Sequence, residues 1–154
     1  MKIRRATQKD IGGLIEVHKS EIKNVSRSVY KREFQDILRK PFRETYVLIE
    51  NSKVKGYVTL NKDFPGYKNC EITRFFVHKK YRRKGIGKKI LDYVEKRLRS
   101  KFLRLCAYTA ETKNKGVRRF YEKCGFKVVS KFPYYFERKR GNPKNAVLYC
   151  KELK

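Results

Sequence analysis

The sequence predicts a mixed α/β (α+β) fold, in which a twisted and mostly antiparallel central sheet of about seven strands is flanked by about four helices. Three observations support this prediction. Some segments place apolar residues at helical spacing, others are β-rich runs bounded by turn residues, and the two kinds alternate irregularly along a chain of 154 residues. We find no repeat, no low-complexity run and no linker rich in Pro, Gly or Ser, and the length suits one domain. We therefore expect residues 1–154 to form a single domain.

The N-terminal quarter of the chain is predicted to contain one strand and two helices. KIRRA at the start favours a short strand, and Thr7 with Asp10 three residues later resembles a capping box. The first helix is predicted from residues that recur at helical spacing: Ile11, Leu14, Ile15, His18 and Ile22. A second helix around 28–40 must end before Pro41, and it presents its apolar residues on one side: Tyr30, Phe34, Ile37 and Leu38.

The middle of the chain predicts an antiparallel meander followed by a helix. Three β-rich runs, 45–50, 54–61 and 69–78, are joined by 51–53 and by the turn at 64–66. Between 84 and 100, apolar residues recur at every fourth position, which is a strong helix signal: Ile86, Ile90, Val94 and Leu98.

The last third predicts three strands and one short helix. A strand over 102–108 precedes a helix over 114–123 that directs Val117, Phe120 and Tyr121 inward, and a strand follows Gly125. The final strand is expected over 146–153. The predicted order is strand, two helices, three strands, helix, strand, helix and two strands.

Composition excludes several classes of protein. Hydrophobic residues make up 40% and aromatic residues 14%, so the chain has more apolar surface than a disordered basic tail. No stretch approaches the roughly 18 apolar residues of a membrane span, and the N-terminus lacks the apolar segment of a secretory signal. We therefore expect a cytoplasmic protein with no membrane partner, as a monomer or homodimer.

Charge predicts an anionic partner. Lys and Arg number 42 against 15 Asp and Glu, a formal net charge of +27. Such a field favours phosphates, nucleic acid or a ribosome surface, and the charge alone does not choose among them.

The cysteines give no metal or disulfide signal. Cys70, Cys106, Cys124 and Cys150 contain no CxxC pair, and the two histidines have no metal-ligand spacing. We expect no metal, and reduced, mostly buried thiols.

The most informative segment is EITRFFVHKKYRRKGIGKK at 71–89. An apolar strand leads into a turn with Arg82, Gly85 and Gly87 in an RxxGxG arrangement, and a helix begins directly after it. Glycine lets the backbone approach a ligand closely, and the free N–H groups of a helix start attract an anion. The turn is therefore a candidate diphosphate site, although a glycine pair before a helix is by itself a weak signal.

A second motif raises the significance of the first. This motif is NKGVRRFYEKCGF at 114–126, which contains Asn114, then Phe120 and Tyr121, and finally Gly125. Together the two motifs and the order of elements resemble the GNAT superfamily of acetyl-CoA-dependent N-acetyltransferases over most of the chain. This resemblance implies a GNAT fold, acetyltransferase activity and acetyl-CoA as cofactor.

The resemblance also implies which residues bind acetyl-CoA. Main-chain N–H groups of the loop would hold the diphosphate, through Arg82, Arg83, Lys84, Gly85, Ile86, Gly87 and Lys88. Phe76 and Val77 would pair with the pantetheine arm, Asn114 would bind the other end of that arm, and Tyr121 would lie beside the thioester sulfur. The surplus of cations around this loop suits a cofactor with several phosphate charges, although many of these side chains would lie on a solvated basic face in any case.

Two residues are candidates for acid–base catalysis. In GNAT histone acetyltransferases a glutamate at the position of Glu71 is the general base, and the alternative for Glu71 is a surface carboxylate paired with a nearby cation. Uninterrupted strand alternation would put Glu71 on one face with Thr73, Phe75 and Val77, and a bulge would change this assignment. Tyr121 is the candidate general acid toward the leaving thiolate, and its alternative is a core aromatic residue at helical spacing.

The class of amine that receives the acetyl group, the acceptor, is predicted from residues 132–149. N-terminal protein acetyltransferases, including the ribosomal-protein alanine type, carry a similar Tyr-Tyr in a hairpin over the substrate, so Tyr134 and Tyr135 are candidate peptide-binding residues. The loop between the first helices lacks the expected Pro-containing signature, which leaves an ordinary aromatic hairpin as the alternative. The other hypotheses are a small-molecule amine acetyltransferase, acting on polyamines or aminoglycosides, and a basic ribosome- or RNA-binding module on the same fold.

Overall fold

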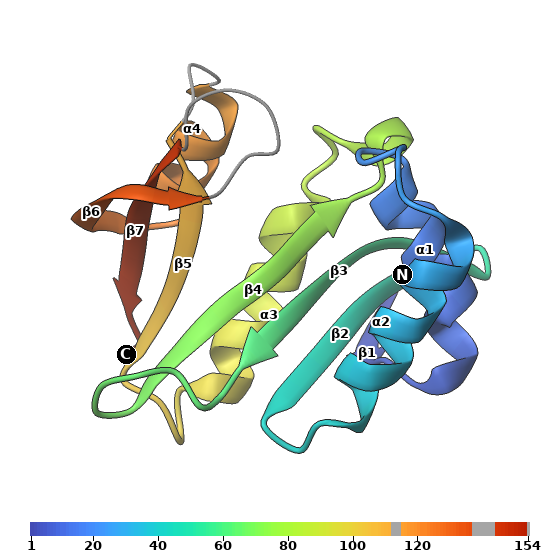
Figure 1. Cartoon of the computed structure of the whole chain (residues 1–154). Helices are drawn as coiled ribbons and strands as arrows, with labels where there is room; N and C mark the ends of the chain where they lie inside the picture. Colours follow the sequence, from blue (N-terminus) through green and yellow to red (C-terminus); the bar gives the residue numbers. More distant parts are fainter. Residues whose placement is uncertain (112–114, 137–143, 154) are drawn as a thin grey trace.

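The computed structural model describes residues 1–111, 115–136 and 144–153. Its seven strands form one sheet in the order β1-β2-β3-β4-β5-β7-β6 (Figure 1). The strands are β1 (Lys2–Arg5), β2 (Arg43–Glu50), β3 (Lys53–Asn61), β4 (Asn69–Val77), β5 (Arg104–Ala110), β6 (Lys127–Phe136) and β7 (Lys144–Glu152). The α-helices are α1 (Ile11–Lys19), α2 (Arg27–Arg39), α3 (Ile86–Leu98) and α4 (Lys115–Lys123), and short 3₁₀ helices lie at Gln8–Asp10 and Lys79–Tyr81. The predicted fold class and order of elements are confirmed.

Local sequence signals explain where the first helices begin. The Asp10 carboxylate accepts a hydrogen bond of 2.8 Å from the Thr7 N–H, which confirms the predicted capping box. Ser26 caps α2, because its Oγ accepts a hydrogen bond from the Val29 N–H. The predicted continuation to Ile22 is wrong: α1 ends at Lys19, and Ile22 is 41% exposed.

The sheet is antiparallel except at one pair. The β2–β3 hairpin turns through Asn51 and Ser52, both with positive φ, as a tight hairpin turn requires. β4 pairs in parallel with β5, and only Asn69–Ile72 of β4 pairs with Arg104–Ala107 of β5. Beyond these residues the two strands diverge, as Figure 1 shows. The divergence leaves the main chain of Thr73–Val77 without a β5 partner.

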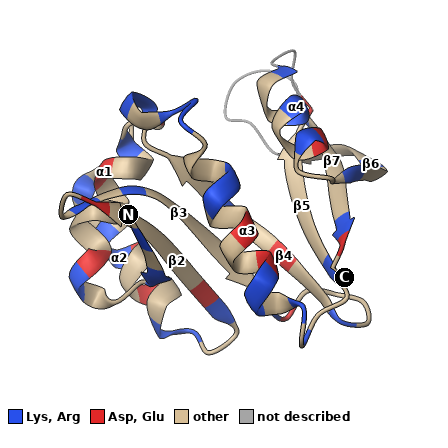
Figure 2. Cartoon of the chain, turned by 180° about the vertical axis from the view of Figure 1, so that it is seen from behind, with Lys and Arg blue, Asp and Glu red and all other residues tan. Residues whose placement is uncertain are grey.

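Two cores cover the two faces of the sheet. On one face, α1 and α2 pack on Val47, Tyr57 and Phe76. On the other face, the apolar side of α3 packs on a larger core that also contains Tyr121 of α4. The exposed sides of α3 and α4 carry many Lys and Arg residues, as the rear view shows (Figure 2). No described helix has the length and apolar character that crossing a membrane would need.

Some predicted details differ from the structure. Val117, predicted to point inward, is 40% exposed, because α4 packs through Phe120 and Tyr121 and leaves Val117 at the edge of the sheet opening. All four cysteines are free, as expected, and Cys70 and Cys106 are buried, whereas Cys124 and Cys150 are half-buried.

Candidate active site

A cleft opens where β4 and β5 diverge. Its volume is about 330 Å³, and it is lined by residues 72–76 of β4, 108–110 of β5, and Val117 and Tyr121 of α4. Because the strands separate here, β4 presents N–H and C=O groups toward the cleft that have no partner on β5. An extended ligand can pair with this free strand edge at Phe76 and Val77.

A β-bulge in β4 decides which way Glu71 faces. Ile72 pairs with Leu60, but Arg74 pairs with Thr59, so Thr73 is the extra residue. Ile72 and Phe75 both pack on the α3 side of the sheet. Glu71 therefore shares the opposite face with Arg74 and Phe76. The prediction from uninterrupted side-chain alternation, which grouped Glu71 with Phe75 and Val77, is therefore wrong for this strand.

Glu71 lies at the closed end of the cleft, one residue before the lining begins. Its Oε1 accepts a hydrogen bond of 3.3 Å from the Asn61 Nδ2 group. Most acidic side chains in the described part of the chain form ion pairs, yet Glu71 has no Lys, Arg or His nitrogen within 4 Å among those residues. Among residues 1–111, 115–136 and 144–153, therefore, no cation neutralises Glu71.

Tyr108 of β5 stands beside Glu71. Burial raises the pKa of Tyr108, and the charges of Tyr135 and Glu71 raise it further. Tyr108 also stacks on Tyr135 of β6, with the ring centroids 5.1 Å apart, and meets Phe64 and Phe132 edge-on. These four rings form an aromatic wall beside the closed end of the cleft.

Tyr121 reaches the cleft from α4. The side chain is only 6% exposed, stacks on Tyr149 at 5.2 Å and meets Phe126 edge-on. Burial raises the pKa of its phenol, so Tyr121 keeps its proton at neutral pH. The position of Tyr121 is therefore compatible with both predictions, a core aromatic residue and a residue that faces the site.

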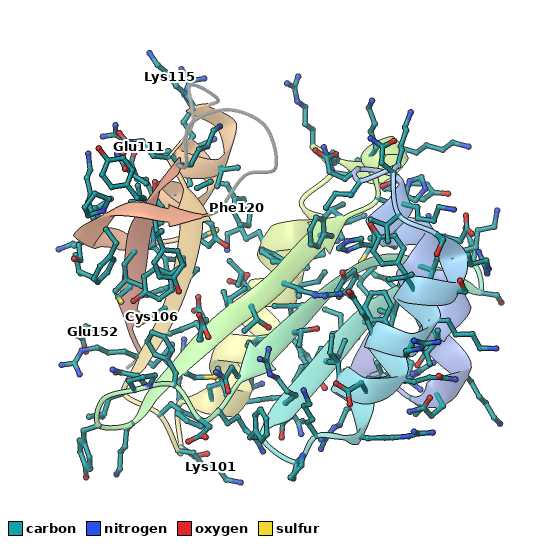
Figure 3. All side chains as sticks on the ribbon, viewed as in Figure 1. Lys101, Cys106, Glu111, Lys115, Phe120 and Glu152 are labelled. Carbon is teal, nitrogen blue, oxygen red and sulfur yellow. The ribbon has the colours of Figure 1, made fainter. Side chains whose placement is uncertain are left out.

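Phe120 occupies the space between α4 and β4 (Figure 3). Its ring lies 5.5 Å from that of Phe75, and a Cβ on Gly87 would come within 3.1 Å of it. Gly87 therefore serves the packing of α3 against Phe120 in this structure. Gly85 differs, because no heavy atom of the described residues lies within 4 Å of the position a Cβ would take there.

The loop before α3 has the backbone of an anion site. Gly85 caps α3 with a φ of +75°, and Arg83 also has a positive φ, +62°. The first N–H groups of a helix have no partner within it, and left-handed residues in such a turn direct N–H groups to one point. Ile86, Gly87 and Lys88 supply these groups, so the loop can hold a diphosphate through its main chain.

Side chains of the same loop divide into paired and free cations. Arg82 donates 2.6 Å to Glu21 and 3.1 Å to the Val77 carbonyl, and Lys88 donates 2.9 Å to Asp92. The other cations are exposed and have no ion-pair partner among the described residues: Lys79, Lys80, Arg83, Lys84 and Lys89. The loop therefore keeps excess positive charge for a polyphosphate ligand.

The remaining predicted site residues lie as follows. Tyr135 is 52% exposed and belongs to the aromatic wall, whereas Tyr134 is 74% exposed with a φ of +55°. Asn114 lies outside the described residues. Sequence reasoning did not single out Tyr108 or Asn61, and no motif in the sequence marks either one. The hydrogen bond of Asn61 to Glu71, and the influence of the Glu71 charge on the Tyr108 pKa, both depend on strand register.

Comparisons with known proteins agree with this geometry. A sequence model of the acetyltransferase (GNAT) family matches residues 13–126. A GNAT-family acetyltransferase structure from Desulfovibrio desulfuricans superimposes with a TM-score of 0.83 at 17% identity, over 99% of each chain. A ribosomal-protein-alanine N-acetyltransferase from Brucella melitensis gives 0.81 at 19% identity, over 99% of this chain and all of the other. A streptothricin acetyltransferase from Bacillus anthracis in complex with acetyl coenzyme A gives 0.67 at 20% identity, over 79% and 68%. No curated protein sequence matches significantly.

The split sheet, the loop before α3 and the cleft beside α4 belong to a fold of acetyl-transfer enzymes. The chain belongs to the acetyltransferase (GNAT) family, and acetyl-CoA is its acetyl donor. The open strand edge of β4 and the open space at Gly85 fit the cofactor's pantetheine arm and diphosphate.

Proposed function

We propose that this enzyme acetylates the α-amino group at the N-terminus of a protein or peptide, by direct attack of the amine on the thioester. The proposal rests mainly on Glu71 at the closed end of the cleft, a carboxylate that accepts a hydrogen bond from Asn61 and has no ion pair with a described residue. A free carboxylate in a protein with a net charge of +27 is available to accept a proton.

Glu71 is the proposed general base. An N-terminal ammonium has a pKa of about 8 and a lysine ammonium about 10.4, a difference near 3 kcal/mol in the work of deprotonation. Glu71 lies just outside the cleft lining, so a bridging water would carry the proton from the amine to its carboxylate. The amine nitrogen then forms a bond to the acetyl carbonyl carbon.

Tyr121 is the proposed general acid. Its phenol is protonated at neutral pH and lines the cleft, so it can donate its proton to the departing thiolate. An N–H of β4 near Phe76 is suited to bind the oxygen that becomes negative, because that part of the strand has no β5 partner. Arg83 to Lys88 hold the diphosphate in this scheme, and Phe76 and Val77 align the pantetheine arm.

The hairpin residues support a peptide acceptor. Tyr135 stands over Tyr108, next to Glu71, and Tyr134 exposes its phenol at the same rim. A peptide chain that enters along this rim can accept hydrogen bonds from both phenols. A cytoplasmic location would give access to such N-termini.

Two other functions have support. A small-molecule amine would use the same cleft with the β6–β7 hairpin closed over it, and the structures of similar fold include one described as a streptothricin acetyltransferase. Docking to RNA or a ribosome is favoured by the many exposed cations on α3 and α4. This second role is compatible with catalysis.

A turnover screen tests the proposal. Purified protein is assayed with acetyl-CoA against peptides with free N-termini, N-terminally blocked Lys peptides, polyamines and aminoglycosides. The proposal expects the highest kcat/KM for free N-termini. Faster turnover of blocked Lys peptides or polyamines would contradict it. Binding of acetyl-CoA without turnover of any amine, together with salt-sensitive RNA binding, would favour the binding module.

A further inference from the structure

Arg74 is the one charged residue among the described residues that line the cleft. The bulge at Thr73 puts it on the same face as Glu71, three residues along the strand. The protein has 42 Lys and Arg residues, yet Arg74 alone among the described ones lines the cleft. Its position is therefore unlike that of the many cations on the surface.

The Arg74 guanidinium is held in place but is not fully satisfied. Its Nη2 donates a hydrogen bond of 2.9 Å to Glu33 of α2, and its central carbon lies 5.4 Å from the Phe34 ring centre. Its Nη1 is buried and makes no hydrogen bond within the described part of the chain. A buried donor left unpaired is costly, so a group that supplies an acceptor is bound favourably.

The surroundings of Arg74 on the sheet are neutral. Burial lowers the pKa of His18, and the nearby Arg74 charge lowers it further, so the imidazole is uncharged at neutral pH. Burial raises the pKa of Tyr57, and the charge of Arg74 and a side-chain hydrogen bond with it act to lower that pKa. The Tyr57 hydroxyl, which lies 2.8 Å from His18 Nδ1, is therefore a neutral neighbour of the Arg74 guanidinium. Glu33 is the only acidic partner of Arg74 among the described residues, and its side chain is 44% exposed. An anion from the cleft would give the guanidinium a further partner, beside Glu33 and the Tyr57 hydroxyl.

We propose that Arg74 binds a carboxylate of the acceptor, so that the enzyme prefers amines that carry an acidic group nearby. This proposal rests on the proposed function and names its substrate class. The Arg74 side chain is 25% exposed and the residue lines the cleft, so a movement of its buried end would bring the guanidinium to a carboxylate there. A guanidinium and a carboxylate form charge-assisted hydrogen bonds of high specificity.

The carboxylate can come from two sources. Three residues of strand span roughly 10 Å, somewhat less across a bulge. The bridging water at Glu71 and the hydrogen bond from Arg74 would each take up about 3 Å of this span. The amine and the carboxylate would then be separated by about the reach of an acidic side chain in the first or second residue of a peptide. A free acidic amino acid is the smaller source of the same group. Polyamines carry only positive charge and gain nothing from Arg74.

The experiment compares matched acceptors with matched variants. Wild-type enzyme, Arg74→Met, Arg74→Lys and the control Arg32→Met, an exposed cation of α2, are assayed with acetyl-CoA. The acceptors are peptides with Asp or Glu in the first two positions, the same peptides with Asn or Gln, and free glutamate and aspartate. Calorimetry with acetyl-CoA checks that each variant keeps its cofactor site.

We expect wild-type enzyme to favour the acidic peptides, and Arg74→Met to raise their KM roughly tenfold or more with little change for the amide peptides. Arg74→Lys should recover part of the loss, and Arg32→Met should behave as wild type. Equal turnover of acidic and amide peptides by wild type would overturn the role of Arg74 and leave N-terminal acetylation intact. Turnover of free acidic amino acids but of no peptide would overturn N-terminal acetylation and support Arg74. A loss in Arg74→Met that is equal for both peptide sets would show a structural role only.

Discussion

Replacing Glu71 with glutamine removes the proposed base without changing its shape. The amide can keep the contact with Asn61, and no ion pair with a described residue is broken, so the fold should be unaffected. At pH 7 about a tenth of an α-amine with a pKa of about 8 is already neutral. The variant can still use that fraction, so we expect kcat to fall roughly 10- to 100-fold at pH 7.

The pH dependence of kcat distinguishes the loss of a general base from general damage to the active site. The deficit of Glu71→Gln should shrink as the pH rises above about 8, because solvent then deprotonates the amine. Asp36→Asn removes the same charge from an exposed carboxylate of α2 that does not line the cleft, and it should leave the profile unchanged. Acetyl-CoA affinity, measured by calorimetry, should be similar in all three proteins. Unchanged turnover, or a deficit equal at every pH, would refute the assignment of Glu71.

Three other predictions concern the cofactor loop, the acid and the first capping box. Gly85→Val should abolish acetyl-CoA binding with the fold retained, because a β-branched residue is strained at a φ of +75°; calorimetry showing normal affinity would refute the diphosphate site. Tyr121→Phe should lower kcat about 10- to 100-fold and leave acetyl-CoA affinity unchanged, measured with a free-N-terminus peptide; full activity would exclude Tyr121 as the acid. Asp10→Asn should reduce the free energy of unfolding by about 2 kcal/mol in urea titrations, since Asp10 accepts bonds of 2.7 and 2.9 Å from Arg4. Although burial acts to raise the pKa of Asp10, its hydrogen bonds to Arg4 and Thr7 lower it overall, so this stabilisation is present at neutral pH and is lost as the pH falls through the folded-state pKa; a variant as stable as wild type at pH 7 would contradict the reasoning.

The basic surface and the cleft differ in their content of positive charge. Exposed cations are numerous on α3, on α4 and in the loop before α3. Among the described residues that line the cleft, however, Arg74 is the one cation. The net charge therefore favours the approach of anionic partners. Among the described residues, the cleft itself has one cation on its lining and the carboxylate of Glu71 at its closed end.

Much of the fold was predictable because it depends on local signals. Apolar spacing from Ile86 to Leu98 predicted α3, and the bounds differ by at most a few residues. Turn residues separated the three strands of the meander, and the RxxGxG arrangement located the loop whose Gly85 takes a positive φ. Each of these features is decided within a few residues of the chain, by side-chain periodicity or backbone freedom.

The sequence by itself determined the family, located the RxxGxG loop before α3 and predicted a candidate base, since these depend on residue types at short spacing. Only the tertiary structure decided which face Glu71 occupies, because one bulged residue, Thr73, reverses the alternation of the strand and no local signal marks it. The same is true of the partners of Arg74 and Tyr108, which come from α2 and β6, far away in the chain. Such contacts are chosen by how helices and strands pack, so they follow from the fold as a whole.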